Sequence, residues 1–136
     1  MEVDGKARWE PVLVTQTEQD GWVVVTVTGE MDLISSPAVR QKVHDAVADG
    51  QRSLVLDLGD VRFCDSSGVG VLIGARRLMR SCAGRLRVVL PEQGEPGPTG
   101  GAHVNRVLAA LGVRRLFDVF PDLTAATDDT ARPLSA

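Results

Sequence analysis

The feature that most constrains this fold is an apolar segment followed by a short polar turn and then by a helix-forming segment. Residues 54–58 are aliphatic apart from one aspartate, a pattern typical of a buried β-strand. Apolar residues then recur at helical spacing over 69–76. Between them lies the segment 63–70, which contains an aspartate, two serines and a glycine in succession. An acid and two hydroxyls therefore stand where a strand is expected to pass into a helix.

The start of that helix allows two interpretations. Its first turn carries unpaired backbone N–H groups and the positive end of the helix dipole. Asp65, Ser66 and Ser67 can all satisfy such N–H groups, and we expect Ser67 to cap or adjoin a helix that runs to Arg80. A phosphate would also be held well at this position. The segment is therefore either a well-capped helix start or the site of a serine whose phosphorylation changes what binds there.

The rest of the chain alternates expected strands with expected helices. Asp20-Gly21 lies between two apolar runs and predicts a tight hairpin turn. Ser36-Pro37 predicts a helix start with Ser36 as the cap, and Gly50 predicts its end. The expected strands are 12–14, 22–27, 53–58, 87–90 and 116–120, and the expected helices are 37–50, 67–80 and 103–111. This order predicts an α/β fold with a mixed β-sheet and helices packed mainly on one face.

The length of 136 residues is typical of a single small domain. We expect residues 1–11 to form an N-terminal lead-in, 12–123 the folded domain, and 124–136 a C-terminal tail with at most a short helix. Residues 91–101 contain three prolines and four glycines, which predicts a long loop within the domain.

Composition and spacing argue against several classes of protein. The net charge is −3, and we interpret the arginines at 76–87 as a solvated helix face, so nucleic-acid binding is not expected. No apolar run is long enough for membrane insertion and no signal sequence is evident near Met1, so we expect a cytoplasmic protein. The two cysteines and two histidines lack the spacing of a metal site, and neither a metal nor another cofactor is expected.

Catalysis is not expected either. Ser66 has no obvious histidine partner and no nucleophile-elbow motif around it. Cys64 adjoins Asp65, and a neighbouring acid disfavours the thiolate that a catalytic cysteine needs. We therefore expect a binding module rather than an enzyme, with no catalytic residue.

Three blocks of the chain resemble one known family. Residues 63–70 are similar to the phosphorylation-site motif of the STAS-domain anti-sigma factor antagonists. Upstream, the segment 28–32 (Thr-Gly-Glu-Met-Asp) ends an apolar strand and resembles a second signature of that family. Residues 114–117 resemble a third block. The resemblance covers residues 12–123 and implies a single small STAS-like domain.

The resemblance implies a function as well. The unphosphorylated domain would bind an anti-sigma factor and so release a sigma factor, and the anti-sigma factor would itself be a serine kinase that ends the complex. A serine phosphatase is a further partner that this scheme allows. Ser66 would accept the phosphate. The residues implied in partner binding are Met31, Asp32, Leu33, Asp65, Ser67 and Gly68.

Two alternatives stay open at this point. Asp32 is either a recognition residue for the partner or kinase, or simply a turn or cap residue. The domain could also be a ligand-sensing or scaffold STAS module, in a signalling assembly or a lipid-transport complex. Such modules do not need an acceptor serine, so the intact Asp65-Ser66-Ser67-Gly68 segment favours the antagonist.

Overall fold

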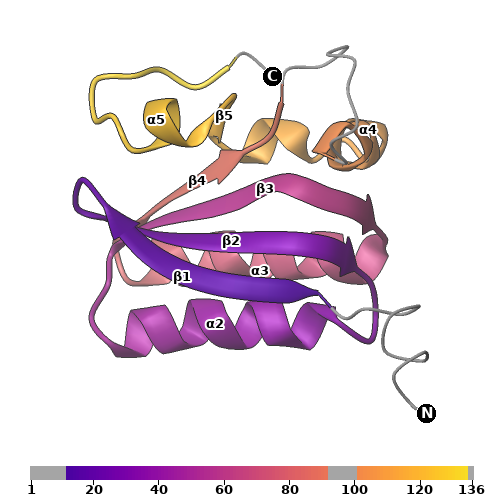
Figure 1. The fold of residues 1–136 in the computed structure, drawn as a ribbon, viewed down its shortest axis with the longest axis horizontal. Coiled ribbons are helices and arrows are strands. Elements are labelled where there is room, and N and C mark those ends of the chain that lie inside the picture. Colours follow the sequence, from indigo (N-terminus) through magenta and orange to yellow (C-terminus); the bar gives the residue numbers. More distant parts are fainter. Residues whose placement is uncertain (1–11, 92–100, 135–136) are drawn as a thin grey trace.

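The computed structural model describes residues 12–91 and 101–134 (Figure 1). The strands are β1 (Leu13–Gln19), β2 (Trp22–Met31), β3 (Ser53–Cys64), β4 (Arg85–Val89) and β5 (Val119–Phe120). The helices are α2 (Ser36–Ala48), α3 (Ser66–Ser81), α4 (Gly101–Ala110) and α5 (Leu123–Ala126), with a 3₁₀ helix at Arg114–Leu116. The expected lead-in 1–11 and most of the expected loop 91–101 lie outside the described residues.

The five strands form one mixed sheet in the order β1-β2-β3-β4-β5. β1 is antiparallel to β2, and the other neighbouring pairs are parallel. The turn between β1 and β2 has φ angles of 53° at Asp20 and 86° at Gly21. Positive φ at both central residues suits a two-residue hairpin, because its twist then matches that of the strands. The predicted mixed sheet and hairpin are both confirmed.

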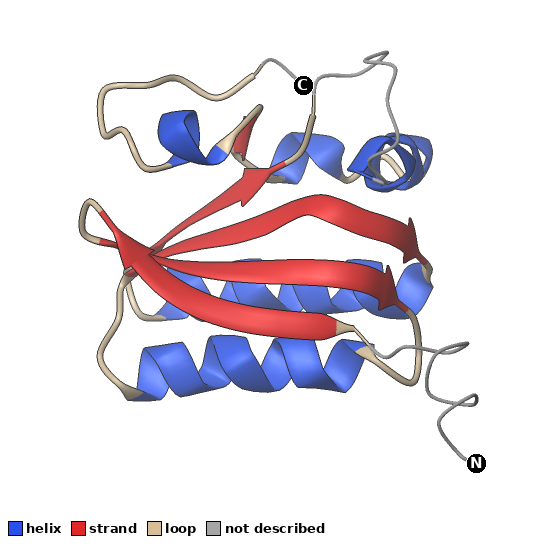
Figure 2. Ribbon diagram, in the orientation of Figure 1, coloured by secondary structure: helices blue, strands red, loops and turns tan. Residues whose placement is uncertain are grey.

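Three helices cover one face of this sheet. Side chains alternate between the two faces along a strand. One set of β2 and β3 side chains, including Val25 and Leu56, forms the main core with Val39 of α2, Leu72 of α3 and Leu108 of α4. Figure 2 shows α2 and α3 side by side along the sheet. The other face carries a smaller core made of Trp22, Val24, Val55, Val89, Phe120 and Ala126. Helices lie mainly on one face, as predicted, and the short α5 covers the other.

Several boundaries differ from the sequence-based prediction. β3 continues past residue 58 to Cys64, because its pairing with β2 runs on through two register shifts. The cap of α2 is Ser35, and Ser36 is already helical and buried. The expected strand 116–120 is shortened, since a 3₁₀ helix occupies its start. Arg85 and Arg87 lie on β4 rather than on a solvated helix face.

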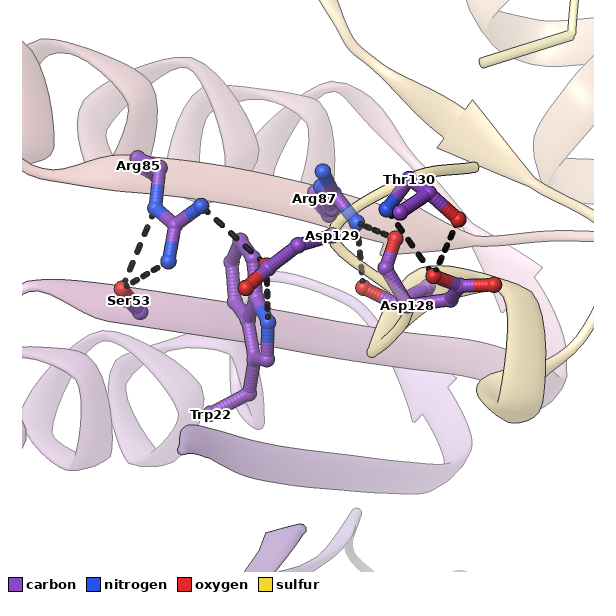
Figure 3. A network of polar contacts seen from close by, with 8 residues as sticks. Trp22, Ser53, Arg85, Arg87, Asp128, Asp129 and Thr130 are labelled. Carbon is purple, nitrogen blue, oxygen red and sulfur yellow. Dashed lines mark hydrogen bonds and ion pairs between the residues drawn. The ribbon is translucent and has the colours of Figure 1, made fainter. Parts of the chain in front are cut away.

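The C-terminal segment packs against the sheet instead of leaving it as a tail (Figure 3). Asp129 accepts a hydrogen bond from Nε1 of Trp22 at 3.2 Å and pairs with Arg85 at 3.3 Å. Arg87 donates to two carbonyl oxygens of this segment, each 2.9 Å away, and its guanidinium lies 4.6 Å from the Trp22 ring centroid. The N–H of Leu134 donates to a carbonyl of β5. Packed structure therefore continues beyond the expected boundary at residue 123.

Candidate functional site

The candidate site lies where β2 and β3 end side by side. Met31, the last residue of β2, is paired with Cys64, the last residue of β3. One residue further on, the N–H of Asp65 donates to the carbonyl oxygen of Met31 at 3.2 Å. Neighbouring strands are about 4.8 Å apart, so the segments that follow them are also neighbours. The fold therefore brings the turn at Asp32 next to the helix start at Ser66.

Asp65 caps the N-terminus of α3. Its backbone is extended, and its Oδ1 accepts hydrogen bonds from the N–H of Ser67 at 2.8 Å and of Gly68 at 3.2 Å. Its carbonyl oxygen accepts the N–H of Val69 at 3.0 Å. Ser67, which was expected to cap or adjoin this helix, lies inside its first turn and supplies a backbone donor to the cap. The carboxylate of Asp65 already occupies the N–H groups that an added anion would use.

Ser66 is the first residue of α3 and its side chain is exposed. Within the described part of the chain, its hydroxyl makes no hydrogen bond to another residue and so has no general base in contact. A serine nucleophile needs such a base, whereas a kinase substrate needs only an accessible hydroxyl. The exposed hydroxyl of Ser66 is accessible in the way that a kinase substrate requires, and its role as phosphate acceptor stays a prediction.

Asp32 closes the turn between β2 and α2. Its Oδ1 accepts the N–H of Ser35 at 2.9 Å and the N–H of Ile34 at 3.0 Å, and the Ser35 hydroxyl is 2.9 Å from the same oxygen. The backbone and side-chain hydrogen bonds from Ser35 lower the pKa of Asp32, against a smaller opposing effect of burial. Asp32 therefore has a structural role in this turn, and its role toward a partner stays a prediction.

Met31 and Gly68 face inward, which does not fit the expectation that they contact a partner. Met31 is 0% exposed. Every second side chain of β2 points into the core, and Met31 follows Val25 and Val27 in that series. That alternation is visible in the sequence and would have placed Met31 correctly. A Cβ at Gly68 would lie 2.7 Å from the Sγ of Cys64 and 2.7 Å from the carbonyl oxygen of Met31. Gly68 thus allows α3 to pack closely on the strand ends.

Exposed apolar side chains gather at this end of the sheet. In the described residues, the large apolar side chains that are exposed are Leu13, Leu33, Ile34, Phe63 and Leu111. Leu33 and Ile34, in the turn after β2, are 71% and 84% exposed. Phe63 is 40% exposed and pairs with Glu30 near the end of β3. Phe63 is an addition to the predicted site, whereas the adjacent apolar residues Leu33 and Ile34 beside Asp32 were already a signal in the sequence for an exposed contact.

The ring of Phe63 stacks on His103 of α4, with centroids 5.4 Å apart and an angle of 19° between the planes. Such stacking contributes about 0.5–1.5 kcal/mol beyond burial. It limits the motion of Phe63 and ties the start of α4 to the same end of the sheet. The stacking on His103 therefore holds the partly exposed ring of Phe63 in a defined position.

The described residues offer neither a reactive thiol at Cys64 nor a group of metal ligands near this site. Burial, and after it the charge of Asp65, raises the pKa of Cys64 to about 11, which keeps the thiol protonated near neutral pH. The described residues contain no group of three or more histidine, cysteine or acidic side chains arranged to hold a metal ion. None of the helices in that part of the chain has the length and apolar character needed to cross a bilayer.

Known proteins share this sequence pattern and this fold. The anti-sigma-F factor antagonist RsfB of Mycobacterium tuberculosis is 35% identical over 63 residues, which are 46% of this chain and 52% of RsfB. The anti-sigma-B factor antagonist of Bacillus subtilis is 33% identical over 75 residues, 55% of this chain and 66% of the relative. The chain thus spans about half the length of RsfB.

The fold gives a longer match than the sequence. The crystal structure of an anti-sigma factor antagonist from Mycobacterium paratuberculosis superposes with a TM-score of 0.70 at 30% identity, covering 85% of this chain and 90% of that one. The family model described as the STAS domain matches residues 14–126, from β1 to the end of α5. The chain therefore belongs to the STAS domain family, and the relatives that it resembles are anti-sigma factor antagonists.

Proposed function

We propose that this domain is an anti-sigma factor antagonist that binds an anti-sigma factor through the end of the sheet carrying Ser66, and that phosphorylation of Ser66 switches this binding off. The observation that carries the proposal is an exposed serine at a helix start, beside the exposed side chains of Leu33, Ile34 and Phe63. The relatives named above bear the name of this activity. The docking surface and its switch would then lie at the same end of the sheet, where β2 and β3 finish.

The capped helix start explains why a phosphate on Ser66 would disrupt docking. Phosphoserine carries about −1.5 to −2 charges at neutral pH. The N–H groups of Ser67 and Gly68 that could neutralise it already bind the carboxylate of Asp65. The phosphate therefore stays in solvent, next to a like charge and to apolar side chains that a partner must cover. Docking would require its desolvation, which is costly without a cationic partner group.

The same arrangement needs no refolding of the domain. Asp65 keeps its capping bonds whether or not Ser66 is modified, so α3 and the turn at Asp32 hold their positions. The switch then acts on the docking surface itself by adding charge, not by moving an element. We propose that the anti-sigma factor is also the serine kinase, and that a serine phosphatase restores the unmodified state in the cytoplasm.

The test compares the affinity of the unmodified domain for an anti-sigma factor of the source organism with the affinities of four altered forms. Ser66→Ala and Ser66→Asn should bind like the unmodified protein, whereas Ser66→Asp and the phosphorylated domain should bind at least about tenfold more weakly. Asn and Asp have nearly the same size, so their difference isolates the charge. Equal affinity of the Asn and Asp variants would contradict a charge switch at this residue.

Phosphorylation itself is measured separately. The anti-sigma factor with ATP should add one phosphate to the domain, mapped by peptide mass spectrometry to Ser66, and none to Ser66→Ala. Transfer to Ser67 instead would move the switch by one residue. Loss of binding by a folded Ser66→Ala variant would mean that the hydroxyl is part of the contact.

A further inference from the structure

Trp22 and two arginines form a cluster on the face of the sheet that α5 covers. Side chains two residues apart on a strand share a face, so Arg85 and Arg87 of β4 point to the same side. Their guanidinium carbons lie 4.2 and 4.6 Å from the centroid of the Trp22 ring, which is within cation–π distance (Figure 3). We call these three side chains the Trp22 site. The site lies at the start of β2, about 30 Å along the strand from Met31 and the proposed docking surface.

The polar groups of the Trp22 site converge on residues 127–134, which we call the C-terminal strap. Nε1 of Trp22 and Nη1 of Arg85 both bind Oδ1 of Asp129, at 3.2 and 3.3 Å. Nη1 of Arg87 donates to the carbonyl oxygen of Asp128 and to that of the last residue of α5, each at 2.9 Å. Side chains of the sheet therefore bind a carboxylate and a main-chain carbonyl of the strap. This combination of contacts is typical of sites that bind peptides.

Most of the strap is held by exposed polar contacts. The side chains of Arg85 and Asp129 are 53% and 65% exposed, and an ion pair this open to water is weak because solvent and salt screen it. The apolar contacts of the strap come from Ala131 and Leu134, both of which are only partly buried. Its first residue, Thr127, is buried and fixes the point where the strap leaves α5. The rest of the strap can therefore leave the Trp22 site while α5 stays in place.

The site and the strap carry opposite charges. The site presents two arginines, whereas the part of the strap that lies on it has two consecutive acids, Asp128 and Asp129. The Trp22 ring is 0% exposed, and its indole N–H is satisfied by the carboxylate of Asp129. A carboxylate accepts from both the indole and the guanidinium and also neutralises Arg85. The site is therefore suited to an aspartate at this position of a peptide.

We propose that the Trp22 site binds an acidic, aspartate-containing segment of a partner protein, and that the C-terminal strap is an internal ligand that such a segment displaces. The strap shows the chemistry that the partner needs, namely a carboxylate beside an accessible main-chain carbonyl. Because the strap is tethered, it competes at an effective concentration on the order of millimolar. The proposal goes beyond the antagonist function and does not depend on it, since the site lies at the other end of β2.

The test uses a full-length variant whose strap is repelled from the site. Asp129→Lys places a cation beside Arg85 and should free the strap. The probe is a fluorescein-labelled peptide with the sequence of residues 124–134, and its binding is followed by fluorescence anisotropy. It should bind Asp129→Lys with a dissociation constant below about 1 mM, and at least about tenfold more tightly than the natural protein, whose own strap competes. Equal affinities, or no binding to the variant, would overturn the proposal.

Matched changes test the chemistry of the contact. Glu18→Lys makes the same change of charge at an exposed residue of β1, and should bind the probe like the natural protein. A probe with asparagine in place of Asp129 should bind Asp129→Lys at least about tenfold more weakly, because it cannot neutralise Arg85. Adding Arg85→Gln to Asp129→Lys should cause a similar loss, whereas adding Arg77→Gln, on the exposed face of α3, should change the affinity less than about twofold. Equal binding of the two probes would show that the site does not read the carboxylate.

The fluorescence of Trp22 reports the position of the strap directly. The chain contains two tryptophans, so Trp9→Phe leaves Trp22 as the single emitter. In that background, Asp129→Lys should shift the emission to longer wavelength because the ring loses its cover, and the probe should reverse the shift. An unchanged spectrum would overturn the strap as a detachable ligand. If Asp129→Lys does not fold, Asp129→Asn gives the same comparison, since it removes the charge and keeps an acceptor oxygen.

Two further measurements separate the proposal from its competitors. Light scattering should find the natural protein monomeric, because the strap occupies its own site. A dimer that is lost in Asp129→Lys would make the strap of a second copy the occupant and overturn a separate partner. Ser66→Ala combined with Asp129→Lys should bind the probe as Asp129→Lys does, so failure at the Trp22 site leaves the antagonist function untouched, and the reverse also holds.

Discussion

The backbone N–H of Asp65 donates to the carbonyl oxygen of Met31 at 3.2 Å and so joins two loops that are far apart in the sequence. On one side of this bond, the carboxylate of Asp65 caps α3 beneath the exposed Ser66. On the other, the chain turns at Asp32 and presents Leu33 and Ile34 to solvent. The two halves of the proposed docking surface are therefore held in fixed relation by main-chain contacts.

Close packing of α3 on the strand ends predicts opposite effects for two glycines of the same helix. Gly68→Ala should lower the free energy of unfolding by about 1–3 kcal/mol, because its Cβ would meet the carbonyl oxygen of Met31 at 2.7 Å. Gly70→Ala should raise it by about 0.5–1 kcal/mol, since its Cβ meets nothing within 4 Å and alanine favours a helix. Urea unfolding of both variants measures the contrast. A neutral Gly68→Ala would show that α3 can shift outward freely.

Polar substitutions in the exposed turn after β2 should weaken partner binding without lowering the stability of the domain. Leu33→Ser combined with Ile34→Ser should weaken binding to the anti-sigma factor at least about tenfold, as expected when central apolar contacts are removed. Both side chains are mostly exposed, so the melting temperature should change by only about 2 °C or less. Leu111→Ser is the control, because Leu111 is 55% exposed and follows the C-terminal end of α4. A matching loss in the control would refute the assignment of the surface.

Replacing Asp32 by its amide separates its charge from its turn. Asp32→Asn keeps the oxygen that accepts from Ser35 and Ile34, so stability should stay within about 0.5 kcal/mol. Asp32→Ala removes that acceptor and should cost about 1 kcal/mol. If Asp32 recognises the partner through its charge, both variants should be poor substrates for phosphorylation or should bind the partner weakly. Normal binding by Asp32→Asn would leave Asp32 with its structural role alone.

The buried thiol of Cys64 predicts a loss of stability at high pH. Its pKa is raised from 9.0 to about 11 in the folded state, so the folded form binds more protons between these values. Stability is then fully present below about pH 9 and falls as the pH rises toward about 11. Urea unfolding across this range should show a steeper decline for the natural protein than for Cys64→Ala. Parallel curves for the two proteins would contradict the raised pKa.

Many local features could be predicted from sequence because their causes lie within a few residues. The Asp20-Gly21 hairpin needs two residues that tolerate positive φ. The start of α3 needs a preceding residue whose short side chain accepts hydrogen bonds from the first backbone N–H groups. The length of β3 could not be predicted in this way. In the second half of β3, buried and exposed side chains do not alternate regularly. The reason is that two register shifts against β2 change which side chains face the core.

The sequence by itself determined the strand and helix order, the mixed sheet, the hairpin and the presence of a serine at a helix start, because these follow from local periodicity and backbone preference. Only the tertiary structure decided that Leu33 and Ile34 are exposed, and that Gly68 packs against Met31. It alone placed the C-terminal strap on Trp22. Exposure and long-range contacts depend on which distant segments meet, and that is set by strand pairing and core packing, which no single segment specifies.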